Sequence, residues 1–257
     1  MDLQTFFAQH PRTALAFSGG TDSAYLLCAA LASGVQVRPY FVRTRFQPAF
    51  ELADARRLCT ELGVELTVLE ADVLACREIA ANPPDRCWHC KRLLFTRLCE
   101  QTAADGFPTV IDGTNASDDA GDRPGMRALR ELGILSPLRE CGITKGEVRR
   151  RSRQAGLFTA DKPSYACLAT RIPAGEPITA ALLQKIEAAE ERVSNLGFTG
   201  FRVRIFHGCA RLQLTTGQMP LAVELREELQ KALRPDFDGV LLDLAPRPDV
   251  REEERNG

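Results

Sequence analysis

Short apolar runs alternate with longer amphipathic stretches along the first half of the chain. The apolar runs have the length of buried strands, and the longer stretches carry apolar residues at helical spacing. Strands are expected over residues 15–17, 35–42, 64–69 and 108–112, and helices over residues 24–32, 48–62 and 86–104. This regular alternation predicts an α/β fold with a doubly wound parallel sheet. Its ligand crevice should lie at the carboxyl ends of the strands.

The second half of the chain predicts a smaller α+β unit. Residues 158–177 have no periodicity, which is typical of a functional loop or a linker. Before this loop we expect helices over residues 72–80 and 144–155 and a brief strand or extended segment over residues 134–138. After it we expect helices over residues 179–196 and 221–233, paired strands over residues 202–206 and 210–215, and a last strand over residues 239–244. Thr144 and Glu147 form a capping pattern for the basic helix. We expect one domain over residues 1–172 and a C-terminal domain over residues 173–257, with a solvated tail from residue 251.

The composition is that of a globular chain with balanced charge. Apolar residues make up 44% and charged residues 26%, and the net charge is −1. That charge gives no bulk attraction for nucleic acid, so a nucleic-acid partner is unexpected. No apolar run approaches the roughly 20 residues that cross a bilayer, and the first residues do not resemble a signal peptide. We expect a cytoplasmic protein without a membrane partner.

The strongest chemical signal is a polar hexapeptide that follows the first expected strand. It consists of Ser18, Gly19, Gly20, Thr21, Asp22 and Ser23. The glycines allow a tight turn, and the following helix directs its unsatisfied N–H groups and positive dipole end into the loop. This arrangement predicts a phosphate site, with hydroxyl donors from Ser18 and Ser23 and a Mg²⁺ ion on Asp22. The structural alternative is a glycine turn with an Asp/Ser helix cap.

A second glycine-bearing loop follows the strand expected over residues 108–112. It contains Asp112, Gly113 and Asn115, again at the carboxyl end of a strand. We expect these residues to line the same nucleotide site, although an Asp-Gly-x-Asn turn needs no ligand.

The cysteines carry the second strong signal. Nine are present, and in a reducing cytosol clustered thiols indicate metal binding or catalysis more than disulfides. Cys87 and Cys90 form a CxxC pattern at a helix start, where the dipole favours thiolates. Half a zinc site, a redox dithiol, an iron–sulfur site and two simply packed thiols all remain open, although the three histidines lack zinc-like spacing. Trp88, between the cysteines, is expected to stack on a pyridinium or adenine ring, or else to shield the thiols.

Cys167 supplies a third thiol from the long loop. We expect the nearby Arg171 to lower its pKa. Three cysteines can hold three irons of a [4Fe–4S] cluster and leave the fourth iron open to bind a sulfide. The alternative for Cys167 is a buried loop thiol. Arg171 is expected to bind substrate phosphate or to pair with an acid, and Arg202 and Arg204 to clamp a nucleotide phosphate or to lie on a solvated strand face.

The motifs together resemble one family. Its pattern is matched by residues 18–23, 112–115, 123–125 and 163–173, in this order. The hexapeptide resembles the PP-loop of the ATP pyrophosphatase superfamily, and the whole set is similar to the LarE-type sulfur transferases. The likeness extends from the first strand into the C-terminal strands. The family often has an acidic residue near Gln213, and its absence here leaves a metal role for that strand unsupported.

The resemblance implies a specific activity. Members use ATP to adenylate a carboxylate of a pyridinium dicarboxylate mononucleotide and convert it to a thiocarboxylate for the nickel-pincer cofactor of lactate racemase. In some members the cysteine matching Cys167 is a sacrificial sulfur donor. Others carry the extra CxxC and are thought to use a three-cysteine [4Fe–4S] cluster, and Cys87 and Cys90 place this chain with them. A homo-oligomer, a nucleotide substrate and a sulfur donor are also implied.

Three other functions remain open from the sequence. A tRNA thiolase also joins a PP-loop to a three-cysteine cluster, but it should carry a basic, aromatic-rich RNA surface. A PP-loop amide synthetase would not need the three cysteines. A non-catalytic nucleotide or iron–sulfur binding protein would bind ATP without releasing pyrophosphate.

Overall fold

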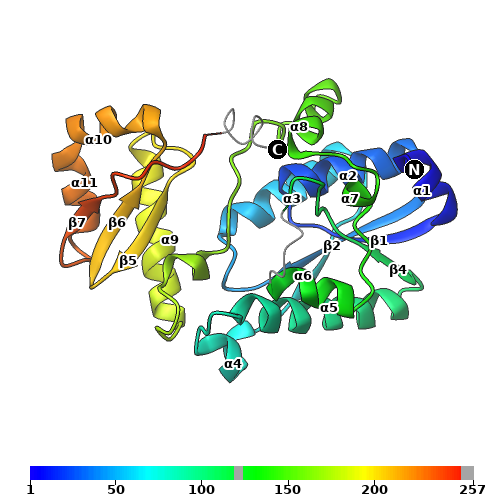
Figure 1. The fold of residues 1–257 in the computed structure, drawn as a ribbon, viewed down its shortest axis with the longest axis horizontal. Helices are drawn as coiled ribbons and strands as arrows, with labels where there is room; N and C mark the ends of the chain where they lie inside the picture. The colour runs from blue at the N-terminus through cyan, green and yellow to red at the C-terminus, as the bar shows by residue number, and fades with distance from the viewer. Residues whose placement is uncertain (119–123, 250–257) are drawn as a thin grey trace.

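The larger part of the molecule is built around a four-stranded parallel sheet (Figure 1). The computed structural model describes residues 1–118 and 124–249. The strands lie in the order β3-β2-β1-β4. Their bounds are β1 Arg12–Ala16, β2 Gln36–Arg43, β3 Thr67–Glu70 and β4 Thr109–Ile111. Leu15 of β1 lies opposite Pro39 on one side and Ile111 on the other. The expected α/β fold with a parallel sheet is confirmed.

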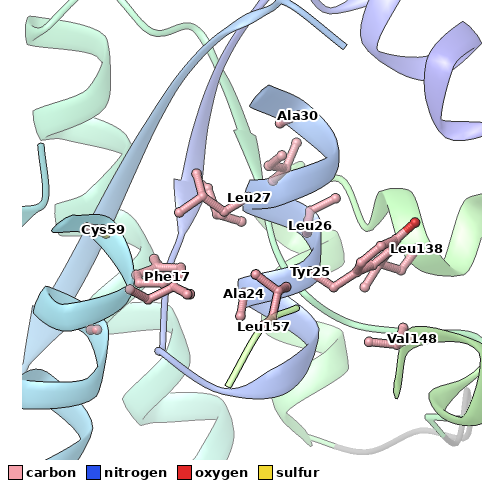
Figure 2. Packing of buried hydrophobic residues seen from close by; sticks show 14 of the residues in the cluster. Phe17, Ala24, Tyr25, Leu26, Leu27, Ala30, Cys59, Leu138, Val148 and Leu157 are labelled. Atoms are coloured by element: carbon pink, nitrogen blue, oxygen red, sulfur yellow. The ribbon is translucent and has the colours of Figure 1, made fainter. Parts of the chain in front are cut away.

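Helices cover both faces of this sheet (Figure 1). On one face lie α1 Leu3–Gln9, α2 Thr21–Ala32, α3 Ala49–Glu61, α7 Pro137–Glu140 and α8 Lys145–Gln154. On the other lie α5 Arg86–Ala104 and α6 Pro124–Glu131. Both faces of β1 are therefore covered, which explains its short apolar run from Ala14 to Ala16. Figure 2 shows α2 at the centre of the larger core, where Leu27 packs toward the sheet and Tyr25 lies beside Leu138.

The C-terminal part contains a second, three-stranded sheet in the order β5-β6-β7. Its elements are α9 Ala180–Asn195, β5 Arg202–Phe206, β6 Cys209–Gln213, η3 Thr216–Gln218, α10 Met219–Glu224, α11 Arg226–Leu233 and β7 Val240–Leu242. β5 and β6 pair antiparallel, as expected, around a tight turn in which His207 and Gly208 have positive φ. Helices α9 and α11 pack on one face, so the core there contains Val203 and Leu212.

A third apolar cluster joins the two sheets. It combines Phe46, Val73 and Ile79 with Leu168, Ala169, Ile172, Ile178, Leu183 and Ile186. The cluster thus contains residues from both sides of the boundary expected at residue 172, and that boundary stays a prediction. Among the described residues, no helix is long and apolar enough to cross a membrane.

Three expected elements differ from the structure. The helix expected over 72–80 is a 3₁₀ turn, η1 Val73–Ala75, followed by α4 Arg77–Ala80, because Cys76 has extended backbone with ψ of 112°. The helix expected over 221–233 is divided into α10 and α11 at Leu225. The brief strand or extended segment expected over 134–138 contains a single bridge, from Leu135 to Ile111, because Pro137 lacks an N–H and starts α7. Arg123 and the tail from residue 251 lie outside the described residues.

Candidate active site

The PP-loop turns tightly between β1 and α2. Gly19 has a φ of +70°, and a Cβ added there would lie 3.1 Å from Ala55 Cβ and from the Glu51 carbonyl oxygen. Ser18 Oγ lies 3.1 Å from Ser23 Oγ and accepts a hydrogen bond from the Gly20 N–H at 3.3 Å. The predicted glycine turn is therefore present, and it leads directly into the N-terminus of α2. N–H groups at such a terminus bind anions.

The loop after β4 packs directly on this turn. A Cβ on Gly113 would lie only 2.9 Å from the backbone nitrogen of Ser23, so no larger residue fits without a shift. Asn115 Nδ2 donates to Asp22 Oδ1 at 3.2 Å. The Asp112 carboxylate accepts from Thr114 Oγ1 at 2.6 Å and from Ser136 Oγ at 2.7 Å, and so shapes its own loop. The two loops meet between β1 and β4, where the strand order reverses, which is the expected crevice of such sheets.

Asp22 has a partner that the sequence did not indicate. Lys145, the first residue of α8, places Nζ 2.6 Å from Asp22 Oδ2. The predicted cap of that helix is present, since Thr144 accepts from the Glu147 N–H and so fixes the backbone next to Lys145. The Asp22 carboxylate is thus neutralised by a lysine and bonded by Asn115. A Mg²⁺ ion on Asp22 stays a prediction, and it would have to share the carboxylate with these partners.

A cavity of about 540 Å³ opens in front of the PP-loop. Asp22 and Ser23 line it on one side, while Cys87 and Lys91 of α5 line it on the other. Its size suits a nucleotide-sized ligand. Lys91 Cδ would lie 3.1 Å from a Cβ on Gly125, so this glycine of α6 leaves room for the lysine stem beside the cavity.

Two of the three predicted thiols are withdrawn from this cavity. Cys87 is exposed, whereas Cys90 and Cys167 are half-buried and pack on the apolar cluster between the sheets. Burial raises the pKa of Cys90 to about 12, and the neighbouring Cys167 and Cys87 add to the rise. Burial also raises the pKa of Cys167, and outweighs the opposing Arg86 and Arg171. The expectation that the helix dipole and Arg171 make these two thiols more acidic is wrong, because desolvation dominates.

Arg86 is the cation that lies next to the thiols. Its Nη2 lies 3.7 Å from Cys87 Sγ, and its Nη1 donates to the Ala169 carbonyl at 2.9 Å and to Asn82 Oδ1 at 2.7 Å. It therefore joins the start of α5 to η2 Leu168–Arg171, next to Cys167. Within residues 1–118 and 124–249, no three Cys, His, Asp or Glu side chains form a ready metal site.

Arg171 is paired with an acid in this structure. Its side chain is fully buried, and Nε and Nη2 donate to the Glu190 carboxylate at 2.8 and 3.0 Å. Nη1 donates to the Ala166 carbonyl at 2.7 Å. The alternative of pairing with an acid is what the structure shows, and the favoured phosphate role stays a prediction.

Arg202 and Arg204 also hold the loop that carries Cys167. Arg202 is buried and donates to the Ser164 carbonyl at 2.7 Å. Arg204 donates to the carbonyl of Thr170 and, at 2.5 Å, to Gln213 Oε1. The two side chains do not lie on a solvated strand face, and the phosphate clamp stays a prediction. A buried guanidinium needs hydrogen-bond acceptors, and here the backbone carbonyls of the loop supply them.

Trp88 lies in the first turn of α5 and contacts α6. Its Nε1 donates to Glu131 Oε2 at 3.1 Å, and the guanidinium carbons of Arg92 and Arg127 each lie 5.0 Å from the ring centroid. These cation–π contacts occupy the indole. Stacking on a substrate ring stays a prediction that requires at least one guanidinium to move.

Sequence reasoning missed four residues of the site, Arg86, Lys145, Lys162 and Glu190. Each acts through a partner far away in the sequence: Lys145 is 123 residues from Asp22, and Lys162 is 108 residues from Asp54. The only available signal was position, because Lys145 follows the helix cap and Lys162 starts the Cys167 motif.

The parallel sheet, the Ser-Gly-Gly-x-Asp-Ser turn after β1 and the nucleotide-sized cavity define a PP-loop ATP pyrophosphatase. An uncharacterized protein of Synechocystis sp. is 36% identical over 249 residues, which are 95% of this chain and 92% of the relative. The pyridinium-3,5-bisthiocarboxylic acid mononucleotide synthase of Lactiplantibacillus plantarum is 30% identical over 242 residues, 91% of this chain and 86% of that enzyme. The tRNA-specific 2-thiouridylase MnmA of Thermotoga petrophila is 25% identical over 194 residues, 59% of this chain and 54% of that enzyme. No protein-family model matches the chain.

The chain belongs to the LarE family of PP-loop enzymes, to which the Lactiplantibacillus synthase belongs. It is an ATP-dependent sulfur-inserting enzyme.

Proposed function

We propose that this enzyme adenylates a carboxylate of a pyridinium dicarboxylate mononucleotide and converts it to a thiocarboxylate for nickel-pincer cofactor biosynthesis. The name of the Lactiplantibacillus relative describes the corresponding product. The observation that carries the proposal is the shared cavity: Cys87 lines the same space as Asp22 and Ser23 of the PP-loop. A thiol and a phosphate site on opposite walls suit an enzyme that activates an acid with ATP and then attacks it with sulfur.

In the first half-reaction the chain's own groups stabilise the departing pyrophosphate. N–H groups at the start of α2 and the Ser18 and Ser23 hydroxyls surround the turn where phosphate binds. Donors that are fixed before the reaction stabilise developing negative charge without reorganising. Lys91, on the opposite wall, adds a positive charge to the cavity. AMP then leaves the activated carboxylate far more readily than hydroxide would. Mg²⁺ accompanies ATP in this proposal, with Asp22 as its ligand.

For the second half-reaction we propose that Cys87, Cys90 and Cys167 hold a [4Fe–4S] cluster. Three thiols from two segments are the donor type that such clusters take, and the pKa of Cys90, raised chiefly by burial, is raised further by the neighbouring Cys167 and Cys87. Bound there, the cluster would supply a renewable sulfide. The chain's part is to keep water from Cys90 and Cys167 by apolar packing and to present Cys87 to the cavity. The alternative sulfur source is the Cys167 thiol itself, consumed once.

The test is the iron and acid-labile sulfide content of protein purified without oxygen. We expect about four irons per chain, lost in Cys87→Ala, Cys90→Ala and Cys167→Ala. Cys99→Ala is the matched control, because Cys99 lies on the same helix as Cys87 and Cys90 but packs against the core between α5 and the parallel sheet. Wild-type protein without iron contradicts the cluster. A loss of sulfur mass at Cys167 after one turnover then indicates the sacrificial route.

A tRNA thiolase remains the second candidate, because the names of the thiouridylase relatives also describe sulfur insertion. Their match covers little more than half of either chain. Retention of tRNA on the purified protein separates the two functions.

We further propose that residues 1–172 form the PP-loop domain and that residues 173–257 form a substrate and oligomerisation domain. We also propose that the enzyme is a cytoplasmic homo-oligomer that receives sulfur from a separate donor.

A further inference from the structure

Lys162 connects the PP-loop to the segment that carries Cys167. Its Nζ lies 2.6 Å from Asp54 Oδ2 and 3.5 Å from the carbonyl oxygen of Gly19. The side chain is largely buried, with 17% of its surface exposed. Asp54 lies on α3, the helix whose Glu51 carbonyl and Ala55 limit the space at Gly19. One ammonium therefore contacts both the PP-loop and the helix that supports it.

A second bond joins the same two segments. Thr21 Oγ1, in the first turn of α2, donates to the carbonyl oxygen of Thr159 at 2.8 Å in the protein interior. The fully buried Arg149 then donates to the carbonyls of Ala160 and Lys162 at 2.7 and 3.0 Å. We call residues 159–171 the strap. Its first four residues are fixed to the PP-loop and to α8.

The far end of the strap is held with equal firmness. Arg202, Arg204 and Arg171 donate to its carbonyls, as described above, and the Leu168 N–H donates to the Phe46 carbonyl at 2.8 Å. Only four residues lie between Lys162 and Cys167. A displacement of the strap at the PP-loop end is therefore transmitted to Cys167 through a short segment.

The charges around Lys162 show that it acts on the protein rather than on the ligand. Asp54 pairs with it, and Glu51 also faces it: burial raises the pKa of Glu51 to about 7, with Lys162 as the largest opposing influence. The lysine lines a separate cavity of about 510 Å³ beside Phe50 and Tyr165, behind the PP-loop. Its charge is already shared by protein acceptors.

We propose that Lys162 is a positioning residue that couples occupancy of the PP-loop to the order of the strap, the segment that carries Cys167. The role of Cys167 rests on the proposed function, whereas the coupling itself requires only a bound nucleotide. Phosphate that fills the turn fixes Gly19 and Thr21, and their bonds to Lys162 and Thr159 fix the strap.

The test is hydrogen–deuterium exchange with α,β-methylene-ATP and Mg²⁺ as the probe. In the wild type we expect the probe to slow exchange both in the PP-loop peptide, residues 17–27, and in the strap peptide, residues 159–171. In Lys162→Met the PP-loop peptide should still be protected, while the protection of the strap falls about fivefold or more. Lys162→Arg should restore it, because Arg can also pair with Asp54. Lys185→Met is the matched control, since Lys185 likewise lies over a ring, that of Phe237, but on α9.

Three results would overturn the coupling: no strap protection in the wild type, strap protection kept in Lys162→Met, or PP-loop protection lost together with that of the strap. The last result would make Lys162 a part of the nucleotide site itself. If Lys162→Met does not fold, Asp54→Asn replaces it with the same expectations. Intact exchange coupling without sulfur insertion refutes only the proposed function, and sulfur insertion without coupling refutes only the role of Lys162.

Discussion

At the scale of single residues, the arginines of this site are structural. Arg171, Arg202 and Arg204 sit where a basic cluster beside a substrate loop suggests phosphate binding, yet each bonds to protein carbonyls or to Glu190. Removing one partner of a buried ion pair leaves an uncompensated charge, which typically costs several kcal/mol. We therefore expect substitutions of Arg171 or Glu190 to lower the stability of the loop, whatever their effect on substrate binding.

Glu51 gives the chain a pH-dependent stability. Its pKa is raised from 4.5 to about 7 by burial, in surroundings that hold Lys162, Arg171, Asp54 and Arg202. Below pH 4.5 the carboxyl is protonated in both states. Between pH 4.5 and 7 the unfolded chain ionises first, so the folded state loses stability as the pH rises, by up to about 3 kcal/mol. We expect Glu51→Gln to remove this loss, so that the variant is more stable than the wild type at pH 8 but not at pH 4. Urea unfolding at both values tests this.

The exposed Glu61→Gln is the control for that series, because Glu61 forms only a surface pair with Arg57. Equal effects of both substitutions at pH 8 would show that the buried carboxyl carries no special cost.

At the scale of elements, the site is built by turns that end strands. The hexapeptide after β1 and the loop after β4 were both predictable, because glycine directly after a buried apolar run indicates a tight turn or a close approach of the backbone to a ligand. The CxxC pattern also marked the start of α5 correctly. The role of α8 was not predictable, since nothing local to Lys145 shows that it faces Asp22. The division at Leu225 and the break at Cys76 were missed because apolar spacing continues across both.

Gly19 is the residue on which the PP-loop turn depends. Gly19→Ala meets both a positive φ and a contact of 3.1 Å to Ala55 and Glu51, so we expect a loss of nucleotide affinity of at least about tenfold and a destabilisation of roughly 1–3 kcal/mol. Gly34→Ala is the control with the same strain: its φ is +72°, but a Cβ there meets nothing within 4 Å. Calorimetric titration with ATP should separate them. Equal affinity for ATP in both variants contradicts the tight-turn account.

At the scale of the whole molecule, the thiols and the phosphate site come from segments far apart in the sequence. Cys167 lies just before the expected domain boundary at residue 172, and the cluster around it contains Phe46 and Val73 from one side and Leu183 and Ile186 from the other. Local patterns predicted the two sheets separately, since each has its own periodicity. They did not predict that the interface between the sheets buries Cys90 and Cys167, because burial depends on long-range packing that periodicity does not encode.

The measurement that tests the central claim most directly is mass spectrometry of pyridinium dicarboxylate mononucleotide incubated anaerobically with the enzyme, ATP, Mg²⁺ and a sulfide source. We expect replacement of a carboxylate oxygen by sulfur, together with AMP and pyrophosphate, and a slower formation of product by Gly19→Ala when ATP is limiting. Release of ADP and phosphate, or AMP without a gain of sulfur by the nucleotide, would contradict the assignment.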